Sequence, residues 1–153
     1  MTDEVLLKLP GPEGFPALPE RKSAELISWS VSPLMPSQIK KNFSAPDETR
    51  PIKKGKVEVL DMGPDLPVMR VTFEPGWKWS ECVKPVAKTE SCQVPHLIYV
   101  VSGRIAIQMD DGQTVEYGPG DVGLIPPGHD AWVIGNEPFV NIDYQGGALY
   151  AKP

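Results

Sequence analysis

The sequence predicts an all-β protein, and three observations lead to that prediction. The chain has 18 prolines and 14 glycines among 153 residues, which makes it rich in turns and argues against a helical bundle. From residue 56 onward, short apolar or alternating runs are bounded by turn residues, as strands are. Few segments are candidates for helices. Many short strands joined by dense turns predict a sandwich or a closed barrel.

Residues 1–55 are expected to form an irregular, proline-rich N-terminal extension that packs on the barrel or on a partner subunit, with the barrel domain at residues 56–153. Eight prolines interrupt any long periodic element in the extension. Residues 24–31 could form a short strand or one or two helical turns, and Trp29 and Phe43 are expected to anchor the arm. The extension is either loosely packed or exchanged with a partner subunit.

The barrel domain is expected to contain a series of short strands, because β-branched and apolar residues recur or alternate over runs of roughly four to eight residues. Asp111-Gly112 favours the tight turn of a hairpin. Residues 85–95 are polar and are expected to form a loop. The expected strands lie at residues 56–61, 68–73, 77–84, 96–101, 104–109, 114–117, 121–125, 131–134 and 139–144.

Residues 118–129 carry the densest turn signals in the chain. Glycine allows backbone angles that other residues avoid and proline fixes its own, so a short apolar strand in this stretch is held between two tight turns. The stretch ends on His129, at a strand mouth, where a barrel keeps its ligand site. The turn residues are Gly118, Pro119, Gly120, Pro126, Pro127 and Gly128.

The composition narrows the class of function. The net charge is −5, whereas proteins that read nucleic acid usually present a basic surface, so nucleic acid is not an expected partner. No apolar run is long enough to cross a membrane, and residues 1–4 lack the start of a secretory signal, so we expect a cytoplasmic protein. Cys82 and Cys92 are too few for a disulfide framework, which leaves free thiols or a metal ligand.

Two stretches carry a family pattern. Gly120 is followed by five residues and then Pro126-Pro127-Gly128, and residues 99–103 read Tyr-Val-Val-Ser-Gly. Residues 120–128 match the second motif of the cupin superfamily. Residues 99–103 look like the end of the first cupin motif. Residues 73–144, almost half of the chain, therefore resemble a small bacterial single-domain cupin. The resemblance implies a cupin jelly-roll β-barrel.

The resemblance also implies metal-ligand positions, and this chain departs from them. Cys82 and Lys84 occupy the slots of the first motif's two histidines, and His96 occupies the slot of its glutamate. The histidine slot of the second motif is Ala131, but His129 lies two residues earlier and would face the same side of a strand. Strand parity then brings Cys82, His96 and His129 to one inner wall of the barrel.

One thiolate and two imidazoles would form a three-ligand site for zinc or iron, with a place left for water or substrate. In the metal-free alternative, Cys82 is a small buried residue, and His96 and His129 are satisfied by hydrogen bonds. Either imidazole could then act as an acid–base catalyst, as in an isomerase or a cyclase. The sequence leaves both alternatives open.

Four further side chains are candidates to bind the substrate. Lys84 would hold an anionic group of the substrate, or simply carry its charge to the rim. The three aromatic candidates could equally be core or interface residues. Cys92, in the polar loop, is expected to be exposed and inert. The candidates are Lys84, Tyr99, Trp79 and Trp132.

These residues favour a small-molecule enzyme of the cupin type, dependent on zinc or iron, that acts on a small organic substrate inside the barrel. The main alternative is a barrel that binds or senses a small ligand without turning it over, and a scaffold role through the N-terminal extension is a third. Cupins of this size are commonly dimers, so the resemblance implies a homodimer. Because one fold hosts many functions, the resemblance leaves the reaction open.

Overall fold

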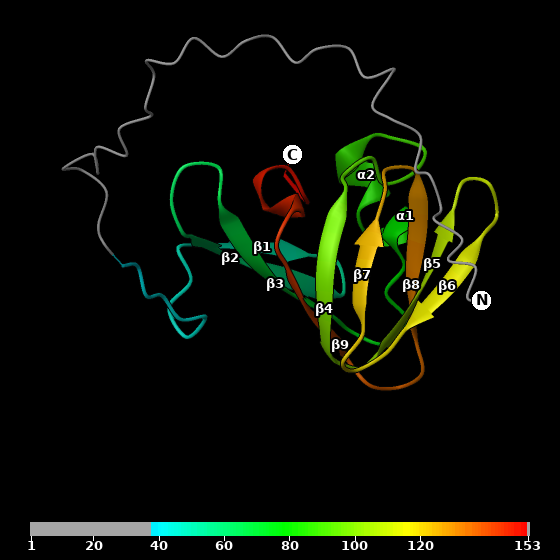
Figure 1. Ribbon diagram of the computed structural model, residues 1–153. Coiled ribbons are helices and arrows are strands. Elements are labelled where there is room, and N and C mark those ends of the chain that lie inside the picture. Colours follow the sequence, from blue (N-terminus) through cyan, green and yellow to red (C-terminus); the bar gives the residue numbers. More distant parts are fainter. Residues whose placement is uncertain (1–37, 153) are drawn as a thin grey trace, which may run out of the picture. The chain divides into compact units, whose positions relative to one another are not determined.

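The structure, a computed structural model, describes residues 38–152. The expected element at residues 24–31 and the Trp29 anchor lie outside these residues. Within them the chain forms nine strands, two short α-helices and one turn of 3-10 helix (Figure 1). The elements are β1 (Glu48–Ile52), β2 (Gly55–Asp61), β3 (Pro67–Phe73), α1 (Trp79–Cys82), α2 (Lys84–Ala87), β4 (His96–Ser102), β5 (Arg104–Met109), β6 (Thr114–Tyr117), β7 (Val122–Ile125), β8 (His129–Ile134), β9 (Phe139–Asp143) and η1 (Gly146–Ala148).

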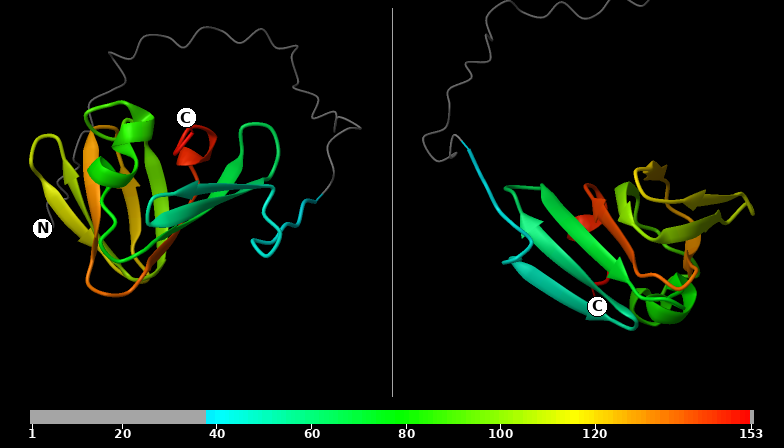
Figure 2. Two further views of the ribbon diagram at one scale, coloured as in Figure 1. Left: turned by 180° about the vertical axis from the view of Figure 1, so that it is seen from behind. Right: turned by 90° about the horizontal axis from the view of Figure 1, so that it is seen from below.

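The strands form two antiparallel sheets. The larger sheet has the order β1-β2-β3-β9-β4-β7, and the smaller has the order β6-β5-β8 (Figure 1; Figure 2). Side chains from both sheets line one interior cavity, so the two sheets face each other. The all-β prediction is confirmed, and two facing antiparallel sheets are compatible with the expected jelly roll.

The core is built by alternation along the strands. In β4, β8 and β9 every second side chain is buried, as a sheet with one face turned to the interior requires. Phe73 stacks on Trp77 with ring centroids 3.6 Å apart, and Phe139 packs beside Phe73 at 6.2 Å. This aromatic group lines the interior cavity together with the polar side chains described below.

Two turns position the strands that carry the site. Gly103 joins β4 in the large sheet to β5 in the small one with φ of +73°, and a Cβ there would collide with the backbone of Pro138. Only glycine adopts that angle and allows that approach at low cost. The expected hairpin at Asp111-Gly112 is confirmed, since β5 pairs with β6 across it and Gly112 has φ of +92°.

The irregular extension expected at residues 1–55 contains a strand near its C-terminal end. Residues 48–52 form β1, which pairs with β2 along its whole length. Arg50 of β1 is buried and donates a hydrogen bond of 2.7 Å to the carbonyl oxygen of Tyr150. Phe43, the expected anchor, lies with its ring 4.9 Å from the guanidinium carbon of Arg70 in β3.

The expected strand at residues 77–84 is also wrong, because most of this segment is helical. The buried residues Trp79, Cys82 and Val83 have the i, i+3, i+4 spacing of a helix face, which a short alternating pattern can hide. Pro85 lies in the first turn of α2, where proline is well tolerated. Lys78 makes only an isolated bridge to Trp132.

Candidate metal centre

His96 is the first residue of β4 and points into the interior. The burial of β4 alternates from His96 onward, and its side chain belongs to the buried set with 8% of the residue exposed. Its backbone lies opposite Ile125 of β7. The parity that the sequence predicts for this strand is therefore confirmed.

His129 is the first residue of β8, directly after the turn at Gly128, whose φ is +90°. The strand alternates from His129 inward, again as predicted. The centroids of the His96 and His129 rings lie 5.4 Å apart with their planes at 69°. Two histidines that are distant along the chain therefore meet inside the protein, because each begins a strand at the same end of the interior.

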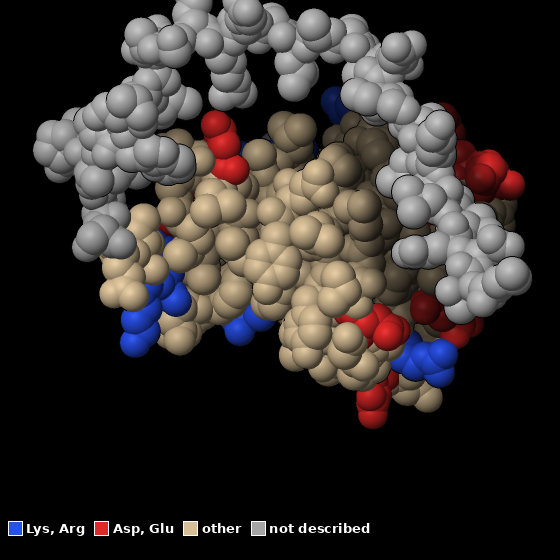
Figure 3. Space-filling view, in the orientation of Figure 1, with Lys and Arg blue, Asp and Glu red and all other residues tan. Residues whose placement is uncertain are grey.

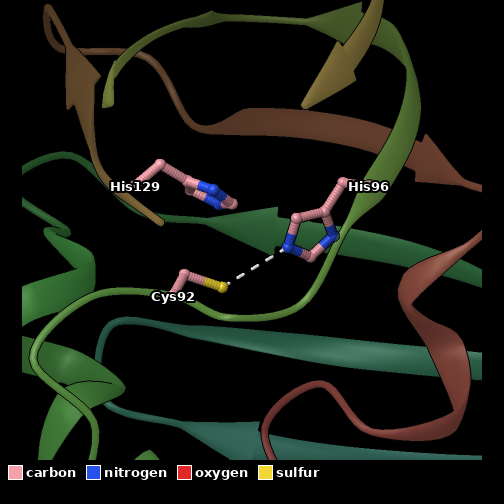
Figure 4. A group of neighbouring side chains, drawn as sticks. All are labelled: Cys92, His96 and His129. Carbon is pink, nitrogen blue, oxygen red and sulfur yellow. Dashed lines mark hydrogen bonds between the residues drawn. The ribbon is translucent and has the colours of Figure 1, made fainter. Parts of the chain in front are cut away.

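Cys92 supplies the thiol beside these two imidazoles. Its N–H donates to the carbonyl of His129 at 2.8 Å, and its own carbonyl accepts from Gly128 at 2.7 Å, so the segment is paired to the start of β8. One ligand atom from each of Cys92, His96 and His129 lies within 4.8 Å of the others, and all three residues are buried. Figure 4 shows the three side chains pointing toward one another.

The spacing of these atoms suits one metal ion. Sγ of Cys92 lies 3.6 Å from Nε2 of His96 (Figure 4). Zinc bonds of about 2.3 Å to sulfur and about 2.0–2.1 Å to nitrogen, set at a tetrahedral angle, place the two ligand atoms about 3.5 Å apart. This cluster could hold a metal with little movement of the thiol and the first imidazole.

Hydrogen bonds on the far side of each ring turn the free nitrogens toward the thiol. Nδ1 of His96 bonds to a carboxylate oxygen of Asp143, and Nδ1 of His129 bonds to the carbonyl of Pro126 at 2.7 Å. Because a carboxylate or carbonyl oxygen only accepts, each Nδ1 carries a hydrogen and each Nε2 is left to bind a metal. Such outer partners fix the tautomer and the orientation of a ligating histidine.

Asp143 is itself held in place. It is 1% exposed on the inner face of β9, and its second oxygen accepts from the N–H groups of Gln145 and Gly146 at 2.9 and 3.2 Å. Gly146 approaches so closely that a Cβ there would lie 2.7 Å from Nδ1 of His96 and 2.9 Å from Asp143. The start of η1 therefore fixes the partner of the first imidazole.

The cluster also shifts the protonation of its members. Burial raises the pKa of the Cys92 thiol, but hydrogen bonds with His129 and His96 outweigh burial and lower the pKa to about 6. Burial lowers the pKa of His96, but its hydrogen bonds to Asp143 and Cys92 raise it to about 9. Without metal, the cluster thus holds a thiolate beside an imidazolium at neutral pH, and thiolate is the form of cysteine that binds metals.

A cavity of about 40 Å³ adjoins the cluster. On this scale one water needs about 10–15 Å³, so the space holds roughly three waters. Tyr150 packs edge-on against His96, with ring centroids 5.2 Å apart. The cavity is lined by side chains of β3, β4, β5, β7, β8 and β9 and by three residues outside the strands, Trp77, Trp79 and Tyr150. The strand residues are Val71, Phe73, His96, Ile98, Ile105, Ile107, Ile125, His129, Ala131, Phe139, Asn141 and Asp143.

The structure places Cys92, and not the expected Cys82, beside the two imidazoles. Cys82 is buried, but it lies in α1 within the hydrophobic core and is not part of the three-residue cluster. The strand parity that placed it beside the imidazoles does not apply to a helix. Cys92, expected to be exposed and inert, is 2% exposed and takes that position.

Among the four expected substrate-binding side chains, Trp79 lines the cavity and the other three do not. Lys84 pairs with Glu90 at 2.7 Å on the surface. Tyr99 points outward from β4 and is 43% exposed. Trp132 faces outward from β8, where its ring lies 5.8 Å from the Lys78 ammonium.

The sequence reasoning missed Asp143, Asn141 and Tyr150. A usable signal exists for the first two: along β9 they share the parity of Phe139, so polar residues recur on a face that should be apolar. Tyr150 follows the last strand and packs beside His96 only through the C-terminal turn. No local pattern in the sequence indicates that contact.

Comparison with known proteins gives a family match. A family model described as the EutQ-like cupin domain matches residues 77–140, the segment that contains α1, the cluster and β4 to β8. No curated protein matches the chain. All three cluster residues lie inside the matched segment.

Several solved structures are similar over part of the chain. An oxalate decarboxylase variant from Bacillus subtilis is 26% identical with a TM-score of 0.48, and the match covers 67% of this chain but 28% of that one. A protein of unknown function from Acinetobacter is 9% identical, with a TM-score of 0.44 and coverage of 60% and 81%. One of unknown function from Rhizobium leguminosarum is 22% identical, with a TM-score of 0.42 and coverage of 61% and 83%.

Proposed function

Because residues 77–140 match the model of the EutQ-like cupin domain, we propose that this chain is a metal-dependent enzyme that acts on a small organic molecule in its interior cavity. One observation carries the proposal: the ligand atoms of Cys92, His96 and His129 meet within 4.8 Å of one another beside that cavity. Three protein ligands with a fourth position left open are typical of catalytic metal sites, whereas structural sites are closed by four.

The donor set favours zinc or iron. One thiolate sulfur and two imidazole nitrogens are softer donors than the oxygens that magnesium and calcium prefer. Both imidazoles have Nδ1 bonded to an oxygen acceptor, which leaves Nε2 as the nitrogen that would bind a metal once the metal displaces any proton it carries. A bound ion of this kind supplies Lewis-acid polarisation of a substrate oxygen.

The chain's own residues set the conditions for that chemistry. Asp143 orients His96, and the Pro126 carbonyl orients His129, so the two rings need no rearrangement when a ligand arrives. The apolar lining of the cavity excludes bulk water, which strengthens every electrostatic interaction with a bound substrate. The small volume restricts the substrate to a molecule of a few heavy atoms.

The decisive experiment is metal analysis of full-length protein purified without added metal, together with two matched cysteine variants. Cys92→Ala is expected to lose the metal, since it removes the only sulfur in the cluster. Cys82→Ala is the control, because it removes a buried thiol of the same chain without touching the cluster. Far-ultraviolet circular dichroism of both variants verifies that each is folded.

Two results would contradict the metal proposal. One is wild-type protein without stoichiometric metal that also fails to take up added zinc or ferrous iron. The other is a metal content that survives Cys92→Ala but disappears in Cys82→Ala. Enzyme and binder are separated by incubating small candidate ligands with the loaded protein: recovered product indicates turnover, and unchanged bound ligand indicates a binding or sensing protein.

A metal-free acid–base enzyme is the second candidate, and one observation favours it. A continuous chain of contacts runs from the Cys92 thiol through His96 to Asp143. A thiol or imidazole oriented in this way can transfer protons to and from a substrate near neutral pH. Activity that persists in chelator-treated protein and is lost in His96→Gln would establish this candidate in place of the first.

The expected homodimer stays a prediction, and one surface supports it. The outward faces of β4 and the edge strand β7 carry exposed apolar residues in register, with Leu97 opposite Leu124 and Tyr99 opposite Val122. Figure 3 shows few charged side chains over these two strands. Patches of this kind mark interaction sites. Sedimentation of the full chain is expected to give a dimer that Leu124→Lys dissociates, and a wild-type monomer would contradict it.

Cellular location also stays a prediction. Among the helices in the described part of the chain, none has the length and apolar character needed to span a bilayer.

A further inference from the structure

Three buried polar atoms, each in a residue that lines the cavity, have no hydrogen-bond partner within the protein. They are Nε1 of Trp77, Nε1 of Trp79 and Oδ1 of Asn141, and within residues 38–152 they are the complete set of such side-chain atoms. The three residues are 1%, 2% and 5% exposed, and all of them line the cavity beside His96 and His129. Unsatisfied groups scattered by chance would not share one cavity.

The chemistry of these atoms specifies what would satisfy them. An indole N–H can only donate a hydrogen bond, and a side-chain carbonyl oxygen can only accept one. Buried polar groups in native proteins are nearly always paired with protein, water or a ligand, because leaving one unpaired costs its full desolvation. A molecule that fills the cavity must therefore bring two acceptors for the indoles and one donor for Asn141.

The two indoles are fixed before any ligand binds. The ring of Trp77 stacks on Phe73, and its backbone carbonyl accepts from the N–H of Val133 at 3.1 Å. Trp79 begins α1, whose next N–H, that of Ser80, donates to Asp130 at 3.1 Å. Donors held by their surroundings in this way lose little entropy on binding, which is the property of a recognition site.

Asn141 is placed by the sheet in an otherwise apolar layer. It lies on the inner face of β9, between Val71 of β3 and Val100 of β4 in register, and both valines are buried. A valine or leucine would fill this position without leaving a buried amide unpaired. The polar side chain is therefore explained by a partner inside the cavity.

The cavity also limits the size and charge of that partner. Its volume of about 40 Å³ corresponds to roughly three waters, so the cavity admits a molecule of only a few heavy atoms. No lysine or arginine is among the cavity-lining residues. An oxygen-rich group is thus received by indole N–H groups and by the cluster, and bulkier molecules do not fit.

We propose that Trp77, Trp79 and Asn141 form a substrate-recognition subsite for a small hydroxycarboxylate. The carboxylate oxygens accept from the two indole N–H groups, and the hydroxyl of the same ligand donates to Oδ1 of Asn141. A carboxylate offers two separate acceptor oxygens, one for each indole N–H, and hydrogen bonds to an ionised acceptor are the stronger ones. This inference rests on the proposed function, because it names the substrate class of the same cavity.

The test follows the indole N–H signals of the full-length protein by NMR while glycolate is added. The chain has four tryptophans, and Trp77→Phe and Trp79→Phe assign two of the four signals by removing one each. Glycolate is expected to shift these two signals and to leave that of Trp132, which lies outside the cavity lining, in place. Trp79→Phe is expected to weaken glycolate binding by roughly tenfold or more.

A second arm isolates Asn141 by comparing glycolate with acetate, which lacks the hydroxyl. Glycolate is expected to bind roughly three- to tenfold more tightly than acetate, the contribution of one neutral hydrogen bond. In Asn141→Leu, which keeps the shape and removes the carbonyl, this preference is expected to disappear. Acetamide, equal in size to acetate but uncharged, is expected to bind more weakly than either acid.

The subsite is contradicted if neither glycolate nor acetate shifts the indole signals of Trp77 and Trp79, because water then satisfies these two N–H groups. Equal binding of glycolate and acetate to the wild type would overturn the role of Asn141. The titration is run on metal-loaded and chelator-treated protein. If the protein binds metal but glycolate leaves the indole signals in place, the metal centre is supported and the subsite is contradicted. If the indole signals shift but the protein takes up no metal, the subsite is supported and the metal centre is contradicted.

Discussion

The two cysteine-bearing segments differ in one respect that decides the site. Cys82 and Cys92 are both buried and lie ten positions apart in the chain. The first sits in α1, within the hydrophobic core. The other lies in an extended segment whose backbone is paired to the start of β8, which sets its sulfur 3.6 Å from the His96 imidazole. Burial alone therefore does not distinguish the thiol of the cluster from that of a core residue, and the distinction comes from the neighbouring element.

The same contrast explains the protonation of Cys92. A buried thiol surrounded by apolar groups is held neutral, because burial disfavours the charged form. Two imidazoles reverse that preference for Cys92 and lower its pKa to about 6. Cys92 meets these partners because the backbone of its segment is paired to the start of β8.

The largest effect that would sharpen this contrast is expected for Asp143→Asn. The asparagine keeps Oδ1 as acceptor for the Gln145 and Gly146 N–H groups, but it no longer offers His96 a carboxylate. Loss of such an outer partner lowers metal affinity roughly 10- to 100-fold. Competition with a chelator measures the affinity, and Asp130→Asn, a carboxyl outside the cluster, is the control. Unchanged affinity would show that Asp143 does not orient His96.

Gly146→Ala tests whether close packing holds the cluster together. The added methyl would lie 2.7 Å from Nδ1 of His96, so the imidazole or η1 must move. Overpacking of this kind costs roughly 1–3 kcal/mol of stability, and metal content is expected to fall with it. Gly118→Ala is the matched control, since its nearest neighbour would be an ordinary 3.8 Å away. Urea unfolding of both variants gives the difference, and equal stabilities would contradict the packing argument.

The pH dependence of the metal-free protein gives a smaller effect. The contribution of Cys92 to the free energy of unfolding is fully present above the unfolded thiol pKa of about 8.5 and is lost as the pH falls through about 6. That of His96 is fully present below the unfolded imidazole pKa of about 6.5 and is lost as the pH rises through about 9. Stability is therefore expected to be highest between about pH 6.5 and 8.5 and to fall toward pH 6 on one side and toward pH 9 on the other.

Thermal unfolding of chelator-treated protein across that range checks the prediction. In Cys92→Ala the loss on the acid side is expected to disappear, because no thiolate remains to be protonated. A wild-type profile identical to that of the variant would show that the thiolate–imidazolium pair does not form.

The smallest effect is expected for Lys84→Ala. Lys84 of α2 pairs with Glu90 at 2.7 Å, so this ion pair links the two cysteine-bearing segments, but it lies on the surface. Exposed ion pairs contribute little to stability. Metal content, melting temperature and glycolate affinity are all expected to match the wild type. A loss of glycolate binding would restore the role in substrate binding that the sequence predicts for Lys84.

Much of the fold could be predicted from the sequence because its signals are local. Turn residues at 118–120 and 126–128 mark the ends of β7, and Asp111-Gly112 marks the β5–β6 hairpin. Alternation then gives the inward direction of His96 and His129. The strand predicted at residues 77–84 was wrong because a run this short fits both the two-residue period of a strand and one face of a helix.

The sequence by itself determined the all-β class, the resemblance to cupins and the inward direction of the two imidazoles, since each depends on residues close together in the chain. Tertiary structure alone decided that Cys92 and not Cys82 completes the cluster, that Asp143 orients His96, and that Trp77, Trp79 and Asn141 share a cavity with them. The physical reason is that these contacts join segments whose separation is fixed only by how the two sheets and the loop beside β8 pack together.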